Sequence, residues 1–228
     1  MSGVYNCYSI YDNVRFRYLT IRTGIRVRTL RESALVGWVS AVHEVKEIFT
    51  RVGESHYESG VNHLEHALQT AHLAESEGAD NALITAALLH DIGHLILLGT
   101  APAGHAALAE HETVAANWLS SRFSEEVTEV ARLHVAAKRY LSALDPKFVY
   151  SLSADSRTSL ALQGGAFTSV EAEQFLQQKF SQNALRLRRW DDAGKVPGVK
   201  TPSLNHFLAI AATQLIQGMG SETETVNE

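Results

Sequence analysis

The segment from Leu88 to His94 holds the residues of this sequence with the clearest capacity for chemistry. It contains His90, Asp91 and His94, and it predicts an imidazole and a carboxylate side by side on one helix. A carboxylate can bridge two cations, and this mix of donors suits iron, manganese or zinc better than calcium or magnesium. Side chains of the same types recur before and after this segment, at His66, His111, His134 and Asp191. Together they predict a metal site, with two metals and Asp91 at its centre.

Helices are expected to position these side chains. From Ser33 onward apolar residues recur at helical spacing, which predicts an all-α bundle over residues 33–220. A helix over 80–94, with Asp80 as its N-cap, would carry His90 and His94 on one face. Further helices are predicted over residues 61–77, 111–121, 125–140 and 203–218, with short helices within 155–192 and a loop over 99–104. Bundles commonly build metal sites from side chains on neighbouring helices.

The two ends of the chain differ from this bundle. Residues 1–32 form a basic extension, in which alternating apolar and basic residues around Thr23-Gly24 are typical of a short β-hairpin. A phosphate-binding arm, a targeting sequence, a disordered extension and a misplaced start codon are alternative interpretations. Residues 221–228 are expected to form a disordered tail.

Composition indicates the broad class of protein. The chain has 228 residues, of which 45% are hydrophobic and 20% charged, values that are ordinary for one globular domain. The net charge of -5 argues against a nucleic-acid binder. No apolar run approaches the roughly 20 residues of a membrane span. A single cysteine, Cys7, and the lack of a compact secretory signal predict a cytoplasmic protein. The remaining histidines are interpreted as surface or structural residues: His43, His56, His63, His72, His105 and His206.

The predicted ligands belong to longer motifs that resemble a known family. His66, the His90-Asp91 doublet and Asp191 match the four-ligand pattern of HD-domain proteins, and His111 and His134 match the subgroup with two metals. The motifs lie at residues 62–66, 86–94, 134–141, 163–165 and 188–191. Over about residues 50–205 the chain resembles the HD-domain mixed-valent diiron oxygenases of phosphonate catabolism. These enzymes cleave the carbon–phosphorus bond of 1-hydroxyphosphonates.

The resemblance implies a role for each matching residue. One iron of an Fe(II)/Fe(III) pair would be held by His66, His90, Asp91 and Asp191, and the other by Asp91, His111 and His134. The substrates would be a small phosphonate and O2, and the products a carboxylic acid and phosphate. The positions that resemble the family's phosphonate-binding set hold His94, Lys138, Ser156 and Arg188. Asp91, His94 and Lys138 are the candidate catalytic residues.

Three of the phosphonate-binding assignments have a simpler alternative. Lys138 and Arg188 could be solvated charges. Ser156 could cap a helix that begins near Arg157.

The site for the other end of the substrate departs from the family pattern. Members that act on a primary amine carry a tyrosine and a glutamate three residues apart, and those positions hold His56 and Ser59 here. A trimethylammonium group has no N–H to donate and prefers aromatic faces. With Ser59 near the amine, the departure favours 1-hydroxy-2-(trimethylammonio)ethylphosphonate, or another 1-hydroxyphosphonate, over 2-amino-1-hydroxyethylphosphonate. The acid formed from these two amines would be glycine betaine or glycine.

Three other functions remain open at this point. A metal-dependent HD phosphohydrolase would attack a phosphate ester with a metal-activated hydroxide and would not need O2. A non-catalytic HD scaffold would be expected to lose ligands, and all six are present. An oxygenase similar to myo-inositol oxygenase would use the same iron chemistry, but its substrate lacks the phosphonate that Lys138 and Arg188 would bind.

Overall fold

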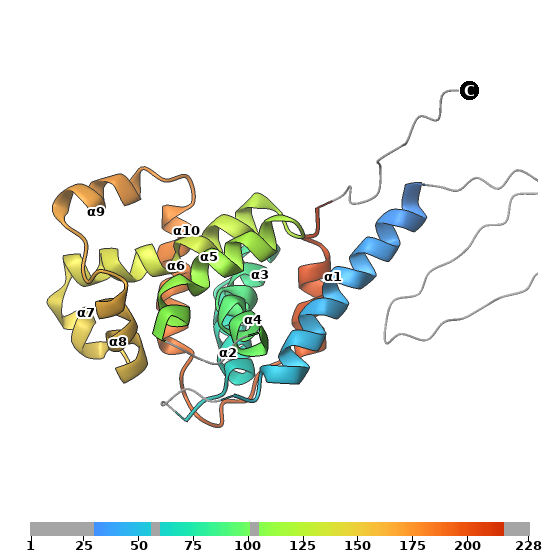
Figure 1. The fold of residues 1–228 in the computed structure, drawn as a ribbon, viewed down its shortest axis with the longest axis horizontal. Helices are drawn as coiled ribbons and strands as arrows, with labels where there is room; N and C mark the ends of the chain where they lie inside the picture. The colour runs from blue at the N-terminus through green and yellow to red at the C-terminus, as the bar shows by residue number, and fades with distance from the viewer. Residues whose placement is uncertain (1–29, 56–59, 101–104, 217–228) are drawn as a thin grey trace, which may run out of the picture.

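The computed structural model describes residues 30–55, 60–100 and 105–216. Over these ranges the chain forms a bundle of α-helices, as predicted from the hydrophobic periodicity (Figure 1). The predicted hairpin within residues 1–32, the tail at 221–228 and the substrate-binding candidate Ser59 lie outside the described residues.

The helices follow one another along the chain with short connections. They are α1 (Leu30–Val52), α2 (His63–Ser76), α3 (Asn81–Leu89), α4 (Ile92–Thr100), α5 (His105–Ser120), α6 (Glu125–Leu144), α7 (Pro146–Ser151), α8 (Ala154–Leu162), α9 (Ser169–Leu176), α10 (Ser181–Ala193) and α11 (Leu204–Ala212).

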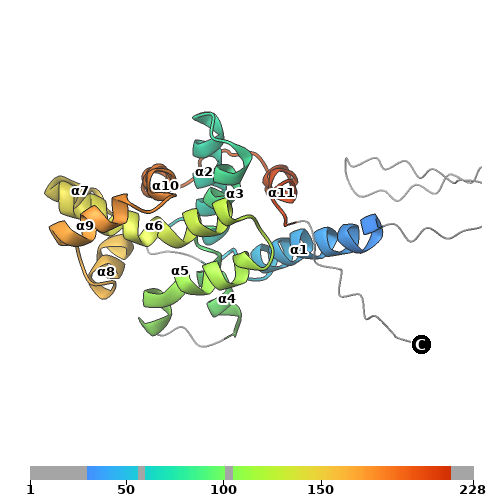
Figure 2. The ribbon, with the colours of Figure 1, turned by 90° about the horizontal axis from the view of Figure 1, so that it is seen from above.

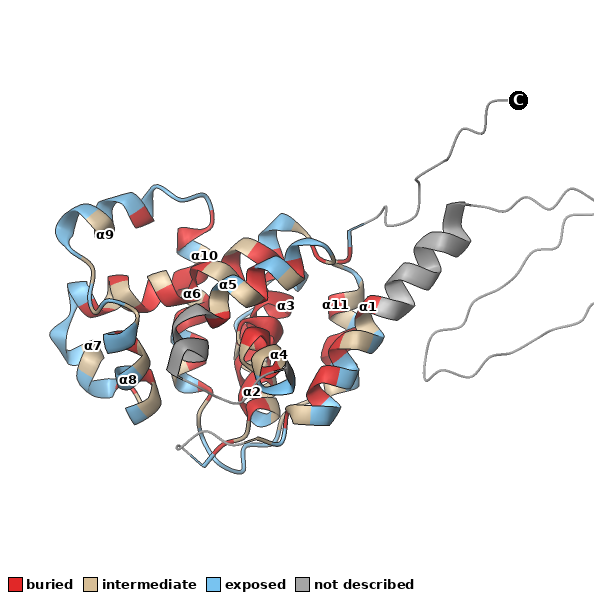
Figure 3. Cartoon of the chain, viewed as in Figure 1, coloured by how far each residue is buried: buried red, intermediate tan, exposed pale blue. Residues whose placement is uncertain are grey.

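The short apolar helix α3 lies at the centre of the bundle and contacts α2, α6, α10 and α11. Its residues 83–89 are all buried, and Figure 3 shows the same buried surface continuing along α6 and α10. Small side chains such as Ala86 and Ala87 let the surrounding helices approach closely. Helices α7, α8 and α9 gather at one end of the bundle, and α1 lies at the other (Figure 2). The metal-site motifs therefore fall in the middle of the core.

The helix predicted over residues 80–94 is interrupted at the His90-Asp91 doublet. Helix α3 ends at Leu89 and α4 begins at Ile92, so the prediction that the doublet lies within one helix is wrong. Gly93 lies just after this turn, and a Cβ on it would lie 1.9 Å from the carbonyl oxygen of His111. The backbone of α4 thus packs directly against α5, a contact that needs glycine. The N-cap prediction is confirmed, because the Asp80 side chain accepts a hydrogen bond of 2.8 Å from Leu83 N–H.

Several other boundaries differ from the predicted ones. Helix α5 begins at His105 rather than at residue 111, and α6 continues to Leu144. Helix α7 was not predicted from the sequence, although Pro146 in its first turn and the Asp145 cap are start signals for a helix.

One described segment, Asn81–Gly99, is long and apolar enough by composition to cross a membrane, with a mean hydropathy of 1.7, so the prediction that no apolar run approaches this length is wrong. It comprises α3 and α4, which are separated by the turn at the doublet, and 61% of it is buried inside the protein. We therefore interpret it as the core of the bundle. The cytoplasmic location stays a prediction.

Candidate metal centre

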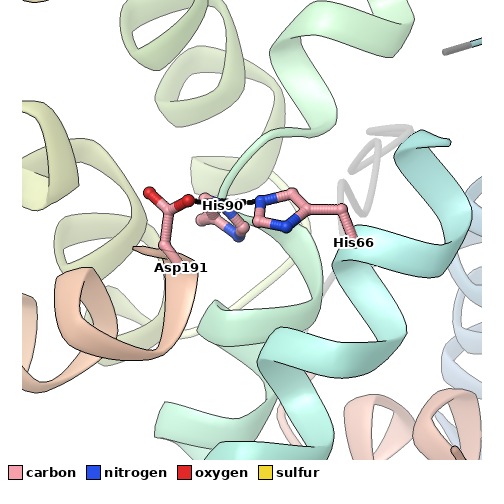
Figure 4. Close-up of side chains that lie close together, drawn as sticks. All are labelled: His66, His90 and Asp191. Atoms are coloured by element: carbon pink, nitrogen blue, oxygen red, sulfur yellow. Dashed lines mark hydrogen bonds and ion pairs between the residues drawn. The ribbon is translucent and has the colours of Figure 1, made fainter. Parts of the chain in front are cut away.

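The first group of candidate ligands comes from three separate parts of the bundle. His66 lies on α2, His90 in the turn after α3, and Asp191 on α10 (Figure 4). The Nε2 atoms of His66 and His90 are 3.2 Å apart. Asp191 Oδ1 lies 3.2 Å from Nε2 of His66 and 3.8 Å from Nε2 of His90. These three donor atoms converge closely enough to hold one metal ion.

A second group lies on the opposite side of Asp91. The Nε2 atoms of His111 on α5 and His134 on α6 are also 3.2 Å apart. Asp91 Oδ1 lies 3.5 Å from His134 Nε2 and 3.7 Å from His111 Nε2. Its other oxygen, Oδ2, lies 3.5 Å from His90 Nε2 and 3.7 Å from His66 Nε2. Each carboxylate oxygen of Asp91 therefore faces one histidine pair, which is the arrangement of a bridging ligand.

The orientation of the histidine rings fits a bound cation. Three Nδ1 atoms donate to backbone carbonyl oxygens: His66 to Gly194 at 2.9 Å, His90 to Ala87 at 2.9 Å, and His134 to Ala131 at 2.6 Å. Because a carbonyl oxygen can only accept, the Nδ1 atoms hold the protons and the Nε2 lone pairs point into the site. Metal-binding histidines are commonly held in this way. Two lone pairs that face each other repel unless a proton or a metal ion lies between them, and the Nε2 pairs lie 3.2 Å apart.

Both carboxylates are ionised, although Asp191 is buried and Asp91 is partly buried. Burial alone would raise the pKa of Asp91, but His90 and His94 hold it well below its usual range. Burial would likewise raise the pKa of Asp191, but the cations of Arg188 and Lys195 lower it. Burial also lowers the pKa of His134 to about 3, which leaves a neutral imidazole with a free Nε2 lone pair. Asp91, Asp191 and His134 are therefore in the protonation state that metal binding requires. Burial lowers the pKa of His90, but Asp91 and Asp191 raise it above its usual value, so a metal ion that binds there would displace a proton.

His94 lies beside the second group and is not part of either one. Its ring stacks on that of His111 at a centroid distance of 3.8 Å, and its Nε2 lies 3.9 Å from Asp91 Oδ1. Burial and the neighbouring His111 lower its pKa to about 3. His94 is thus a neutral hydrogen-bonding group at the edge of the site.

Lys138 and Arg188 are buried, so the alternative that they are solvated is wrong. Their exposed fractions are 2% and 3%. Lys138 Nζ donates to Ser159 Oγ at 2.7 Å, and burial together with the charge of Arg188 lowers its pKa to about 7. Arg188 donates to Asp191 Oδ2 at 2.7 Å and binds both oxygens of Asp192.

Ser156 lies beside Arg188 rather than at a helix cap. Its Oγ is 3.5 Å from Arg188 Nη2. The cap of α8 is Ser153, whose Oγ accepts a hydrogen bond from Ser156 N–H at 3.2 Å. Because α8 begins at Ala154, the interpretation of Ser156 as a cap before Arg157 is wrong.

Two neighbours of the site were not predicted from the sequence. Lys195 contacts Asp191 and Ser156. Its spacing of four residues from Asp191 is the feature of the sequence from which its place beside that ligand could have been predicted. His63 is 8% exposed, and its ring centroid lies 6.0 Å from that of His94. The interpretation of His63 as a surface residue is therefore wrong, whereas its interpretation as a structural residue stays a prediction. His43 and His206 are exposed, as predicted.

Comparison with known proteins agrees with this geometry. The HD domain family matches residues 63–155. The chain is 46% identical over 164 residues to hydroxymethylphosphonate dioxygenase of Gimesia maris. The aligned region covers 71% of this chain and 81% of the relative. It is also 36% identical over 180 residues to the glycine-betaine-forming [1-hydroxy-2-(trimethylamino)ethyl]phosphonate dioxygenase of Leisingera caerulea. That aligned region covers 76% of this chain and 90% of the relative.

The helical bundle and the two converging donor groups define an HD-domain protein with a dinuclear metal site. With these relatives, the chain belongs to the HD-domain family of phosphonate dioxygenases, and the predicted oxygenase class is confirmed.

Proposed function

We propose that this protein uses O2 to cleave the carbon–phosphorus bond of a small 1-hydroxyphosphonate. The single observation that carries the proposal is the position of two buried basic side chains beside the bridged donor set. Lys138 and Arg188 come from different helices, yet both lie near Asp191. A buried cation needs a compensating anion. The carboxylates of Asp191 and Asp192 compensate the charge of Arg188. The ammonium of Lys138, in contrast, donates its hydrogen bond to the neutral hydroxyl of Ser159.

Hydroxymethylphosphonate is the first substrate that we propose. The relative with 46% identity is named for it, and this compound has no amine. The positions where amine-binding members of the family carry tyrosine and glutamate hold His56 and Ser59 here, which is consistent with a substrate that has no ammonium group to bind. The trimethylammonio and 2-amino compounds are the next candidates.

The proposed reaction balances without a further reductant. Hydroxymethylphosphonate dianion and O2 give formate, hydrogen phosphate and one proton. The C–P bond and one C–H bond are broken, carbon is oxidised and O2 is reduced. Two bound metals would supply Lewis-acid contacts to the substrate oxygens and the electrons that activate O2.

The residues of the chain have separate tasks in this proposal. His66, His90, Asp91 and Asp191 would hold one iron, and Asp91, His111 and His134 the other. Lys138, Arg188 and Ser156 would bind the phosphonate oxygens through charge-assisted hydrogen bonds. His94, being neutral, would donate one N–H to the same group. Close packing around these side chains keeps bulk water out and strengthens each of these interactions.

The decisive experiment measures phosphate release from three 1-hydroxyphosphonates, with and without O2. The panel is hydroxymethylphosphonate and the trimethylammonio and 2-amino compounds, with p-nitrophenyl phosphate added as a phosphate ester. We expect O2-dependent release from the first compound, with formate in equal amount. Release of phosphate from the ester without O2, and none from the phosphonates, would contradict the proposal and indicate a hydrolase.

Iron content is the first further prediction. Protein purified under reducing, iron-replete conditions should contain about two irons per chain, because six donors of this type form two groups around Asp91. Elemental analysis and Mössbauer spectroscopy would measure this. A maximum of one iron per chain would show that the second group does not bind metal.

Lys138→Ala should raise KM for the phosphonate about tenfold or more, which corresponds to one charge-assisted hydrogen bond. Iron content should stay unchanged, because the Lys138 ammonium is not one of the donor atoms. In the wild type KM should also rise as pH increases above about 7, because the free enzyme then loses the Lys138 proton. Steady-state kinetics over a pH series would check both effects.

The Lys138→Ala variant serves as its own control in the pH series. Its KM should be high but should not rise further above about pH 7, since the titrating ammonium is gone. An equal rise in both proteins would assign the pH dependence to another group.

A further inference from the structure

Lys195 contacts two residues of the site that lie on different helices. It follows the end of α10 and its side chain is 12% exposed. Its Nζ lies 2.8 Å from Asp191 Oδ1 and 3.3 Å from Ser156 Oγ. The ammonium therefore lies between a candidate metal ligand and the serine that resembles a phosphonate-binding residue.

Three basic side chains gather near Ser156, namely Lys138, Arg188 and Lys195. Arg188 and Lys195 contact the carboxylates of Asp191 and Asp192, whereas Lys138 donates to the hydroxyl of Ser159. Asp91 and Asp191 also act on this group of charges, and metals bound to those carboxylates would offset their negative charge and favour an anion beside Ser156.

The two ammonium groups also affect each other directly. The positive charge of Lys195 contributes to the lowered pKa of Lys138, after burial and Arg188. An anion placed between these cations would relieve their repulsion.

We propose that Lys195 is a further substrate-binding residue that contacts the phosphonate group together with Ser156. This inference rests on the function proposed above. A phosphonate oxygen that accepts a hydrogen bond from Ser156 Oγ can also lie within reach of Lys195 Nζ, because those two atoms are only 3.3 Å apart. Two phosphonate oxygens would then be shared among Lys138, Arg188 and Lys195, and the dianion would lie among three basic side chains.

A role limited to orienting Asp191 is the competing explanation, and the choice of variants separates the two. Lys195→Gln keeps a donor that can bind Asp191 but removes the charge. Lys195→Met removes both, and Lys195→Arg keeps the charge. Lys200→Met is the matched control, because Lys200 is an exposed lysine of the same connection between α10 and α11.

The experiment measures binding of methylphosphonate to the metal-loaded enzyme by isothermal titration calorimetry, with metal content determined on the same samples. Methylphosphonate has no hydroxyl group and serves as a probe of the phosphonate contact alone. We expect Lys195→Gln and Lys195→Met to weaken binding about tenfold or more with unchanged metal content. Lys195→Arg should stay within about threefold of wild type, and Lys200→Met should equal it.

Three results would overturn the inference. The first is wild-type affinity in both neutral variants. The second is loss of metal from Lys195→Met while the remaining loaded sites keep wild-type affinity, which would show that Lys195 only orients Asp191. The third is a wild-type enzyme that does not bind methylphosphonate. If instead binding depends on Lys195 but no hydroxyphosphonate releases phosphate, the proposed function fails and the inference stands.

Discussion

Replacing Asp91 with alanine should remove both metals and abolish phosphate release. Its two oxygens face two different histidine pairs at 3.5 to 3.7 Å, so one substitution removes a ligand from both groups. Loss of a residue that only supports a metal ligand costs about 10- to 100-fold in affinity or activity, and a shared ligand should cost more. We therefore expect a fall in kcat of more than about a hundredfold, measured with metal content on the same preparation.

His63→Ala is the matched control for this experiment. His63 is also a buried neighbour of the site, close to His94, but it contributes no atom to either donor group. Its burial lowers its pKa to about 3, so the substitution removes a neutral ring. The variant should keep both metals. Equal metal content in the Asp91 and His63 variants would show that Asp91 is not a ligand.

The candidate ligands could be predicted from the sequence because the residue types of metal donors and their order along the chain indicate a metal site. Six histidine and aspartate side chains in otherwise apolar helical segments have few structural explanations. The role of Asp80 as an N-cap could also be predicted, because an N-cap side chain binds a backbone N–H within three residues of its own position. Signals of this kind are local, and local signals are present in the sequence.

The turn at the His90-Asp91 doublet could not be predicted in the same way. Residues 80–94 have continuous helical periodicity, and the turn precedes the point where Gly93 on α4 packs against the backbone of His111 on α5. Tertiary contacts of this kind can override local propensity. The position of Lys195 at the site could not be predicted for the same reason, because its neighbour Ser156 is 39 residues away in the sequence.

Arg188→Ala should be the most destabilising single change at the site. Arg188 is almost completely buried and contacts two carboxylates, those of Asp191 and Asp192. Removing one partner of a buried ion pair costs about 3–5 kcal/mol, because the remaining charge loses compensation. Asp191 would keep its contact with Lys195, whereas Asp192 would lose the guanidinium that binds both of its oxygens. The free energy of unfolding in urea should fall by about this amount, and Asp191 should lose its fixed position, so that iron content falls as well.

Arg189→Ala is the matched control, because Arg189 is the next residue of α10 and is exposed. Its stability should lie within about 0.5 kcal/mol of wild type, as is usual for surface substitutions. Arg188→Lys should restore only part of the loss, since an ammonium cannot reproduce the planar guanidinium that contacts both carboxylates. If Arg188→Ala instead keeps its stability and iron and shows only a higher KM, then binding substrate is the main role of Arg188. Because Arg188 connects the proposed phosphonate-binding residues to a candidate metal ligand, we expect both properties to change together.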